Sequence, residues 1–161
     1  GLPVVSVGKI SDIFAGRGVS ASNPITSNAD GMEKTINLAR AAGSGFVFTN
    51  LVDFDMLFGH RNDVRGYANA LKAFDRRLPE ILAAMLPDDL LFITGDHGCD
   101  PTTPSTDHSR EYTPLLVVGQ AVRDGADLGT RGSFGDIAAT AADWLGVKGE
   151  LEGITFLPLL A

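Results

Sequence analysis

The sequence of 161 residues contains a single cysteine, Cys99, so no disulfide can form within the chain. Scarce cysteine is typical of a reducing compartment, and we expect a cytoplasmic protein. No apolar run approaches the ~18 residues that a membrane-spanning helix needs. There is no signal-peptide pattern either, so we expect no membrane partner.

Basic residues are outnumbered, with 13 Lys and Arg against 20 Asp and Glu, and the net charge is −7. This balance argues against nucleic acid or an anionic membrane surface as a partner. An anionic substrate remains compatible, because bound cations can reverse the local sign of the field. The length suffices for one domain with a real core, and no repeat or second domain is evident.

Strand-like and helix-like segments alternate along the chain. Four apolar runs are typical of buried strands: 4–8, 45–52, 89–93 and 114–119. Three segments have apolar residues at helical spacing: 31–42, 64–85 and 134–145. Three others read as loops or polar connections: 17–30, 96–112 and 121–132. The alternation predicts an α/β fold with a mainly parallel sheet flanked by helices.

Several residues indicate where these helices begin, break or end. Ser27 or Asn28 is expected to cap the first helix, and Ser133 the last, because their side chains can accept from free backbone N–H groups. Pro79 is expected to kink or break the second helix, since proline lacks an N–H. Gly146 is expected to end the last helix.

Acidic residues and all three histidines follow the predicted strands. Asp55 and His60 come after the second strand, Asp96 and His97 after the third, and His108 lies in the loop beyond. Because the carboxyl ends of neighbouring parallel strands share one edge, we expect these five side chains to converge.

Imidazole and carboxylate ligands of this kind suit Zn²⁺ or Mn²⁺. Five ligands exceed the needs of a structural zinc and fall short of filling two metal sites without help. Two-metal sites are the usual device for phosphoryl transfer, which the pattern therefore favours. A single metal or a hydrogen-bonded loop is the alternative.

A nucleophile is harder to place. Cys99 adjoins the cluster and is a candidate nucleophile, ligand or packing residue. Four hydroxyls in the following loop are candidates or simply solvated: Thr102, Thr103, Ser105 and Thr106. Lys9 follows the first strand, where it could meet a phosphate or only solvent.

Three motifs resemble those of the phosphopentomutases of the alkaline phosphatase superfamily. They are NLVDFD with Gly59-His60 (50–60), TGDHG (94–98) and TDHSREYTP (106–114). Two further segments fit the same family: GKISDIF (8–14) and FGDIAAT (134–140). The resemblance covers nearly the whole chain and implies part of an alkaline phosphatase-like core.

The resemblance also implies an activity and a set of roles. Phosphopentomutases interconvert ribose 1-phosphate and ribose 5-phosphate, and the deoxyribose equivalents, with two Mn²⁺ ions and a phosphothreonine. By position, Asp55, His60 and His108 would hold one metal, and Asp96 and His97 the other. Lys9 would lie near the substrate phosphate. Zn²⁺ or another divalent ion would also fit these ligands.

In that family the nucleophilic threonine and a further metal-binding aspartate lie in an N-terminal core segment, and a cap domain follows it. The resemblance thus implies that residues 1–161 are the C-terminal part of a metal-dependent phosphotransferase core. The partners would be a pentose phosphate, that segment and that cap, and this chain would be inactive alone. The alternatives are a cofactor-independent phosphoglycerate mutase, a phosphatase or a non-catalytic metal-binding domain.

Overall fold

The computed structural model describes residues 1–41 and 43–160, which form two compact units. Unit 1 comprises residues 1–86 and 95–113, and unit 2 comprises 87–94 with the chain from 114 onward. The division follows from strand pairing, because the strands on either side of 95–113 pair with each other and not with the first sheet.

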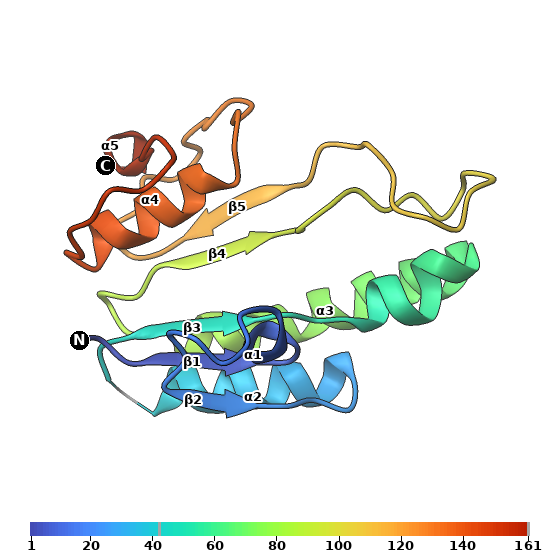
Figure 1. The fold of residues 1–161 in the computed structure, drawn as a ribbon, viewed down its shortest axis with the longest axis horizontal. Coiled ribbons are helices and arrows are strands. Elements are labelled where there is room, and N and C mark those ends of the chain that lie inside the picture. Colours follow the sequence, from blue (N-terminus) through green and yellow to red (C-terminus); the bar gives the residue numbers. More distant parts are fainter. Residues whose placement is uncertain (42, 161) are drawn as a thin grey trace. The chain divides into compact units, whose positions relative to one another are not determined.

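The sheet of unit 1 is parallel, in the order β2-β1-β3 (Figure 1). Its strands are β1 (Val4–Val7), β2 (Ala21–Asn23) and β3 (Phe46–Thr49). Strand β2 corrects the prediction of a loop over 17–30. Its residues are small and polar, yet as an edge strand it needs only one bonded neighbour, and β1 supplies the ladder from Val5 opposite Ala21.

Three helices belong to unit 1: α1 (Ile10–Ile13), α2 (Asn28–Arg40) and α3 (Val64–Ala84). Of the two predicted caps, Ser27 is the one used: its Oγ accepts from the Asp30 N–H at 3.2 Å, and Asn28 is the first residue of the helix. The predicted end of this helix at residue 42 lies outside the described residues. Helix α3 continues through Pro79, so the predicted break does not occur.

The core of unit 1 lies where α2 packs against β1, β3 and α3. Its most buried apolar side chains are Val7, Ile10, Met32, Ile36 and Ile81. The apolar face predicted for α3 is only partly covered, since Leu71 and Leu82 stay exposed while Ile81 is buried.

Unit 2 is built on β4 (Leu91–Thr94) and β5 (Leu115–Val118), which pair antiparallel. The predicted sheet is mainly parallel, and this pair is the antiparallel part of the strand pairing. A parallel pair needs a crossover, usually helical, and the segment between these strands contains none in the described chain.

Two helices complete unit 2, α4 (Gly135–Trp144) and α5 (Leu157–Leu160). Helix α4 ends before Gly146, whose φ of +65° is the left-handed conformation expected there. Its N-cap is Phe134, and the predicted cap Ser133 instead accepts from the Gly135 N–H at 3.0 Å.

Candidate metal centre

Three of the five predicted ligands meet in unit 1. The ligand atoms of Asp55, His60 and His108 all lie within 4.8 Å of one another. The two carboxylate oxygens of Asp55 are shared, Oδ2 lying 3.1 Å from His60 Nε2 and Oδ1 3.4 Å from His108 Nε2. One carboxylate and two imidazoles are a donor set suited to Zn²⁺ or Mn²⁺.

An irregular turn positions the first two candidate ligands. After β3, the chain forms a π-helical turn (η1, Phe54–Phe58) and then a 3₁₀ turn (η2, Gly59–Arg61). Asp55 lies on η1 and His60 on η2. The turn ends at Asn62 in the left-handed region, with φ +51°. Single π turns are rare and often mark functional sites, because the extra residue re-aims the side chains.

Backbone contacts orient His60. Its Nδ1 lies 2.6 Å from the carbonyl oxygen of Thr106, which can only accept, so Nδ1 carries the proton. The lone pair of a neutral ring is then on Nε2, facing Asp55. Metal-binding histidines commonly use a carbonyl in this way to select the tautomer.

Asp55 also fits a bound cation. Its Oδ1 is buried and makes no hydrogen bond with any part of the chain that the structure describes. A buried carboxylate oxygen without such a partner is costly, and a divalent ion would satisfy it. The residues present therefore fit the predicted metal.

The structure does not gather Asp96 and His97 into a set of three ligands. The two are adjacent, with His97 Nε2 3.6 Å from Asp96 Oδ1, but the Asp96 side chain is 71% exposed. The His97 ring stacks on His108 with centroids 3.6 Å apart. A backbone bridge between Gly98 and Ser109 folds the segment back and makes this contact possible.

The candidate nucleophiles of the loop are held by local contacts. Thr102 Oγ1 donates to Asp100 Oδ1 at 2.6 Å, and Thr103 Oγ1 donates to the Asp100 carbonyl at 3.0 Å. Donation from Thr102 lowers the pKa of Asp100. Burial, followed by the charges of Asp55, Asp100 and Glu111, raises the pKa of Cys99. The thiol therefore stays protonated at neutral pH, which favours packing over nucleophilic attack.

Lys9 lies beside the same turn. It follows β1, and its Nζ is 2.8 Å from the Met56 sulfur, one residue beyond Asp55. The lysine is exposed, so its ammonium is open to an anion in solution. Neither the Met56 contact nor the Thr106 carbonyl could be found from sequence, because main-chain and thioether partners leave no motif.

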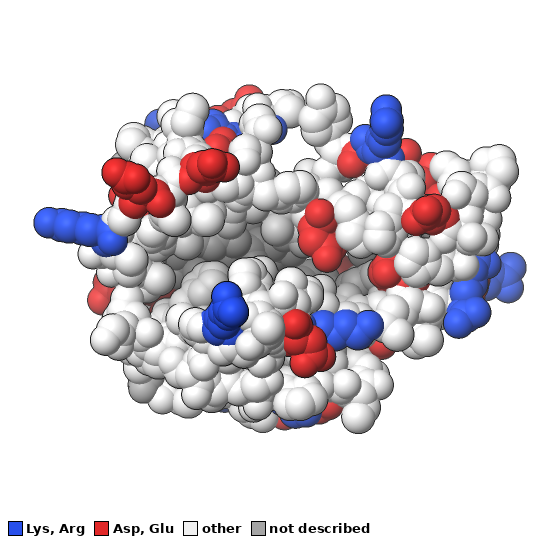
Figure 2. All heavy atoms as spheres, in the orientation of Figure 1, with Lys and Arg blue, Asp and Glu red and all other residues white. Residues whose placement is uncertain are grey.

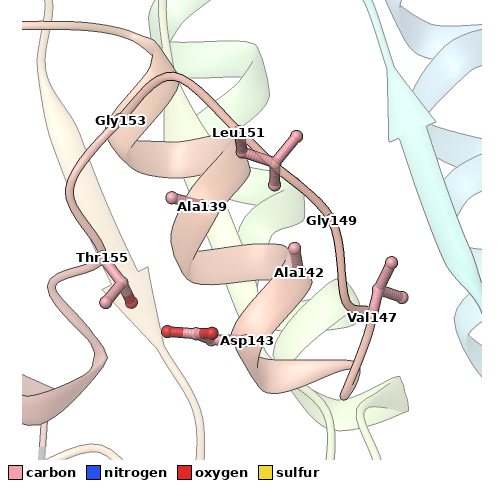
Figure 3. Close-up of a pocket in the computed structure, with 8 residues that line it drawn as sticks. All are labelled: Ala139, Ala142, Asp143, Val147, Gly149, Leu151, Gly153 and Thr155. Atoms are coloured by element: carbon pink, nitrogen blue, oxygen red, sulfur yellow. The ribbon is translucent and has the colours of Figure 1, made fainter.

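Elsewhere the surface shows no comparable cluster within the described ranges 1–41 and 43–160. Figure 2 shows acidic and basic side chains interspersed over the visible face. A hollow of about 210 Å³ opens in unit 2 beside α4, lined mainly by small and apolar residues (Figure 3). It shares no residue with the candidate metal cluster. None of the described helices is long and apolar enough to cross a membrane.

A carboxylate–imidazole cluster that follows a parallel strand defines the class as a metal-binding α/β protein. Comparison with known families then places it: a model described as the metalloenzyme superfamily matches residues 4–149, and the chain belongs to that superfamily.

Curated relatives agree with the motif resemblance. The chain is 59% identical to a phosphopentomutase of Acetivibrio thermocellus, 58% to one of Desulfitobacterium hafniense and 54% to one of Kosmotoga olearia. The alignments cover 98%, 98% and 97% of this chain. The chain spans about 40% of the length of these relatives. The predicted resemblance to phosphopentomutases is confirmed.

Solved structures confirm the predicted α/β core. The phosphoglycerate mutase of Leishmania mexicana, solved at low cobalt concentration, matches with a TM-score of 0.71 and 18% identity, over 96% of this chain and 37% of its own. The PH0037 protein of Pyrococcus horikoshii matches with a TM-score of 0.66 and 19% identity, over 92% and 50%. At these identities the likeness concerns the fold alone.

Proposed function

We propose that this chain supplies part of the active site of a phosphopentomutase, which interconverts ribose 1-phosphate and ribose 5-phosphate and the deoxyribose equivalents. The cluster of Asp55, His60 and His108 carries the proposal, because it joins metal-ligand chemistry to a sequence 54–59% identical to proteins named phosphopentomutase. Such a reaction belongs to pentose phosphate and nucleoside metabolism and would fit a cytoplasmic protein.

Each ligand has a part in this proposal. Asp55, His60 and His108 hold one divalent cation, and Asp96 and His97 contribute to a second, with Mn²⁺ as the proposed metal and Zn²⁺ as the alternative. Divalent cations there would neutralise phosphoryl oxygens and align them for in-line transfer. Asp55 supplies the compensating negative charge, and the Thr106 carbonyl keeps His60 Nε2 free to coordinate.

Lys9 is proposed to pair with the substrate phosphate. Its exposed ammonium beside the Asp55 turn supports this role, since a phosphate near the cluster would gain a charge-assisted contact. The phosphothreonine that carries the transferred group, a further metal-binding aspartate and the cap that shields the sugar are proposed to belong to other segments of the complete protein. On this proposal the 161-residue chain alone does not turn over substrate.

The test is mutase turnover of ribose 1-phosphate with added Mn²⁺, by the complete protein that contains this chain. Replacing His97→Ala or His108→Ala should lower kcat/KM by more than about tenfold, because each removes a metal ligand. Asp75→Asn, on the exposed side of α3, is the control and should keep full activity.

Three outcomes would contradict the proposal. A loss below about tenfold in both histidine variants would argue against the metal roles. Turnover of 3-phosphoglycerate or of a simple phosphate ester without mutase activity would indicate another enzyme of the superfamily. Tight Mn²⁺ binding by the complete protein without any turnover would indicate a non-catalytic metal-binding domain.

A further inference from the structure

The metal cluster is assembled from two segments that are far apart in the sequence. Asp55 and His60 lie on the turn 54–61, and His108 lies on the loop 95–113. The distance between the two sets of ligands therefore depends on how closely the loop packs on the turn. We call the contact between these segments the seam.

Gly59 lies at the seam, and its backbone angles do not account for the choice of glycine. Its φ of −60° and ψ of −61° are ordinary right-handed helical values that any residue adopts. The residue is buried, however, and a Cβ built on it would overlap Cys99 Sγ and come within 3.2 Å of the Phe54 carbonyl oxygen. Any side chain at residue 59 would force the Cys99 sulfur or the turn to shift, because only a hydrogen atom fits beside the sulfur in the observed arrangement.

Cys99 is the matching partner on the loop. It is a free thiol, partly buried, and it lies two residues after His97. Two further contacts tie the loop to the turn and to the residue that follows it. Asn62 Nδ2 donates to the Thr103 carbonyl at 3.0 Å, and His60 donates to Thr106. The steric contact at Gly59 and the hydrogen bonds of Asn62 and His60 therefore set how closely the loop packs against the turn.

We infer that Gly59 and Cys99 are positioning residues that set the distance from Asp55 and His60 to His108. Gly59 directly precedes His60, so a side chain that lifts the loop by a few tenths of an ångström separates the ligands. Metal–ligand distances tolerate only about 0.2 Å, so such a shift weakens binding. The inference rests on the proposed metal site and deepens it.

The experiment is Mn²⁺ titration calorimetry on the complete protein that contains this chain, repeated with Zn²⁺, beside thermal unfolding of the metal-free protein. We expect Gly59→Ala to weaken affinity by about 10–100-fold, as loss of ligand-orienting partners does. Cys99→Ala alone should lose less affinity than Gly59→Ala, because the hydrogen bonds of Asn62 and His60 still hold the loop against the turn when the sulfur is removed. The double variant should regain most of the lost affinity, since the methyl group then occupies space vacated by the sulfur.

Gly31→Ala is the matched control. Gly31 is buried on α2 of the same unit, and its Cβ would lie 2.7 Å from Leu51 Cδ2. This variant should change the unfolding temperature of the metal-free protein and leave Mn²⁺ affinity unchanged. If Gly59 had only a structural role, Gly59→Ala would also change the unfolding temperature and leave Mn²⁺ affinity unchanged. A loss of affinity beyond that of Gly31→Ala is therefore the diagnostic result.

Other outcomes separate the two proposals. Should Gly59→Ala not fold, Cys99→Val adds bulk from the opposite side of the seam and should weaken Mn²⁺ binding alike. The positioning role would be overturned if a folded Gly59→Ala variant bound Mn²⁺ within about threefold of the unaltered protein. It would also be overturned if the double variant bound Mn²⁺ no more tightly than Gly59→Ala. An unaltered complete protein that binds neither Mn²⁺ nor Zn²⁺ would overturn the metal site itself.

Discussion

Thr140 joins helix α4 to the chain that follows it. Its fully buried hydroxyl donates to the Asp136 carbonyl at 2.7 Å and accepts from the Phe156 N–H at 3.0 Å. One hydroxyl therefore satisfies a buried main-chain donor that would otherwise be unpaired, and it holds the adjoining Phe156 ring, which is 1% exposed.

Replacing Thr140→Val should lower the free energy of unfolding of unit 2 by about 1–3 kcal/mol, because a buried N–H loses its acceptor. Urea unfolding followed by the fluorescence of Trp144, the single tryptophan, measures this. Thr140→Ser keeps the hydroxyl and should lose less. Equal stability of the valine and serine variants would show that the hydrogen bond is not the cause.

Asp136 adds a charged contact to the same region. It is 4% exposed and accepts from the Ile154 N–H and from Arg131, each at 2.8 Å. The Ile154 hydrogen bond, helped by Arg131, lowers the pKa of Asp136. A lowered folded-state pKa means that this carboxylate stabilises the fold above its unfolded pKa of about 3.9 and loses that effect as pH falls through the folded value.

Asp136→Asn should therefore lower the unfolding temperature at pH 7, and the gap to the unaltered chain should narrow below about pH 4. The narrowing follows because protonated aspartic acid resembles asparagine. Thermal unfolding by Trp144 fluorescence from pH 7 to 3 measures the gap. A gap that stays constant over this range would mean that the ionised carboxylate contributes nothing specific.

Among the helices, α2 shows how a local signal can define an element. Ser27 accepts from Asp30 at the first turn, and Asp30 in turn pairs with Lys34 at 2.9 Å. These contacts depend only on neighbours in sequence, so the cap and the start of the helix could be predicted. Helix α3 shows the limit of such reasoning, since its packing against α2 outweighs the missing N–H of Pro79.

Ser27→Ala should destabilise unit 1 by about 1 kcal/mol, because the Asp30 N–H loses its acceptor. Ser27→Asp retains an oxygen at the cap and should stay close to the unaltered chain. Urea unfolding by far-ultraviolet circular dichroism gives both values. An alanine variant as stable as the aspartate variant would rule out the cap as the source of this stability.

Over the whole molecule, a bound ion would link the turn 54–61 to the loop 95–113 within unit 1. Ligand that binds only the folded state stabilises by about 2.7 kcal/mol at a hundredfold excess over Kd. We expect Mn²⁺ to slow amide hydrogen exchange in both segments by up to about a hundredfold and to leave α4 in unit 2 unchanged. Uniform slowing in both units, or none, would contradict binding at this cluster.

The sequence by itself determined the elements that depend on near neighbours and the residues with ligand chemistry. Local sequence was enough to predict the apolar strand that begins near residue 89, the helix cap at Ser27 and the helix end at Gly146. The three histidines could likewise be identified from the sequence alone. Only tertiary structure decided that β4 pairs with β5, and that Asp55, His60 and His108 meet while Asp96 faces solvent.

The physical reason is that these outcomes depend on contacts between distant residues. A glycine at 59 has ordinary backbone angles, and its lack of a side chain gains meaning only where Cys99 packs against it. His60 is oriented by the backbone carbonyl of Thr106. Every residue type has such a carbonyl, so no sequence pattern marks this one. The sequence supplied the candidate ligands, and packing of the loop on the turn placed Asp55, His60 and His108 within reach of one another.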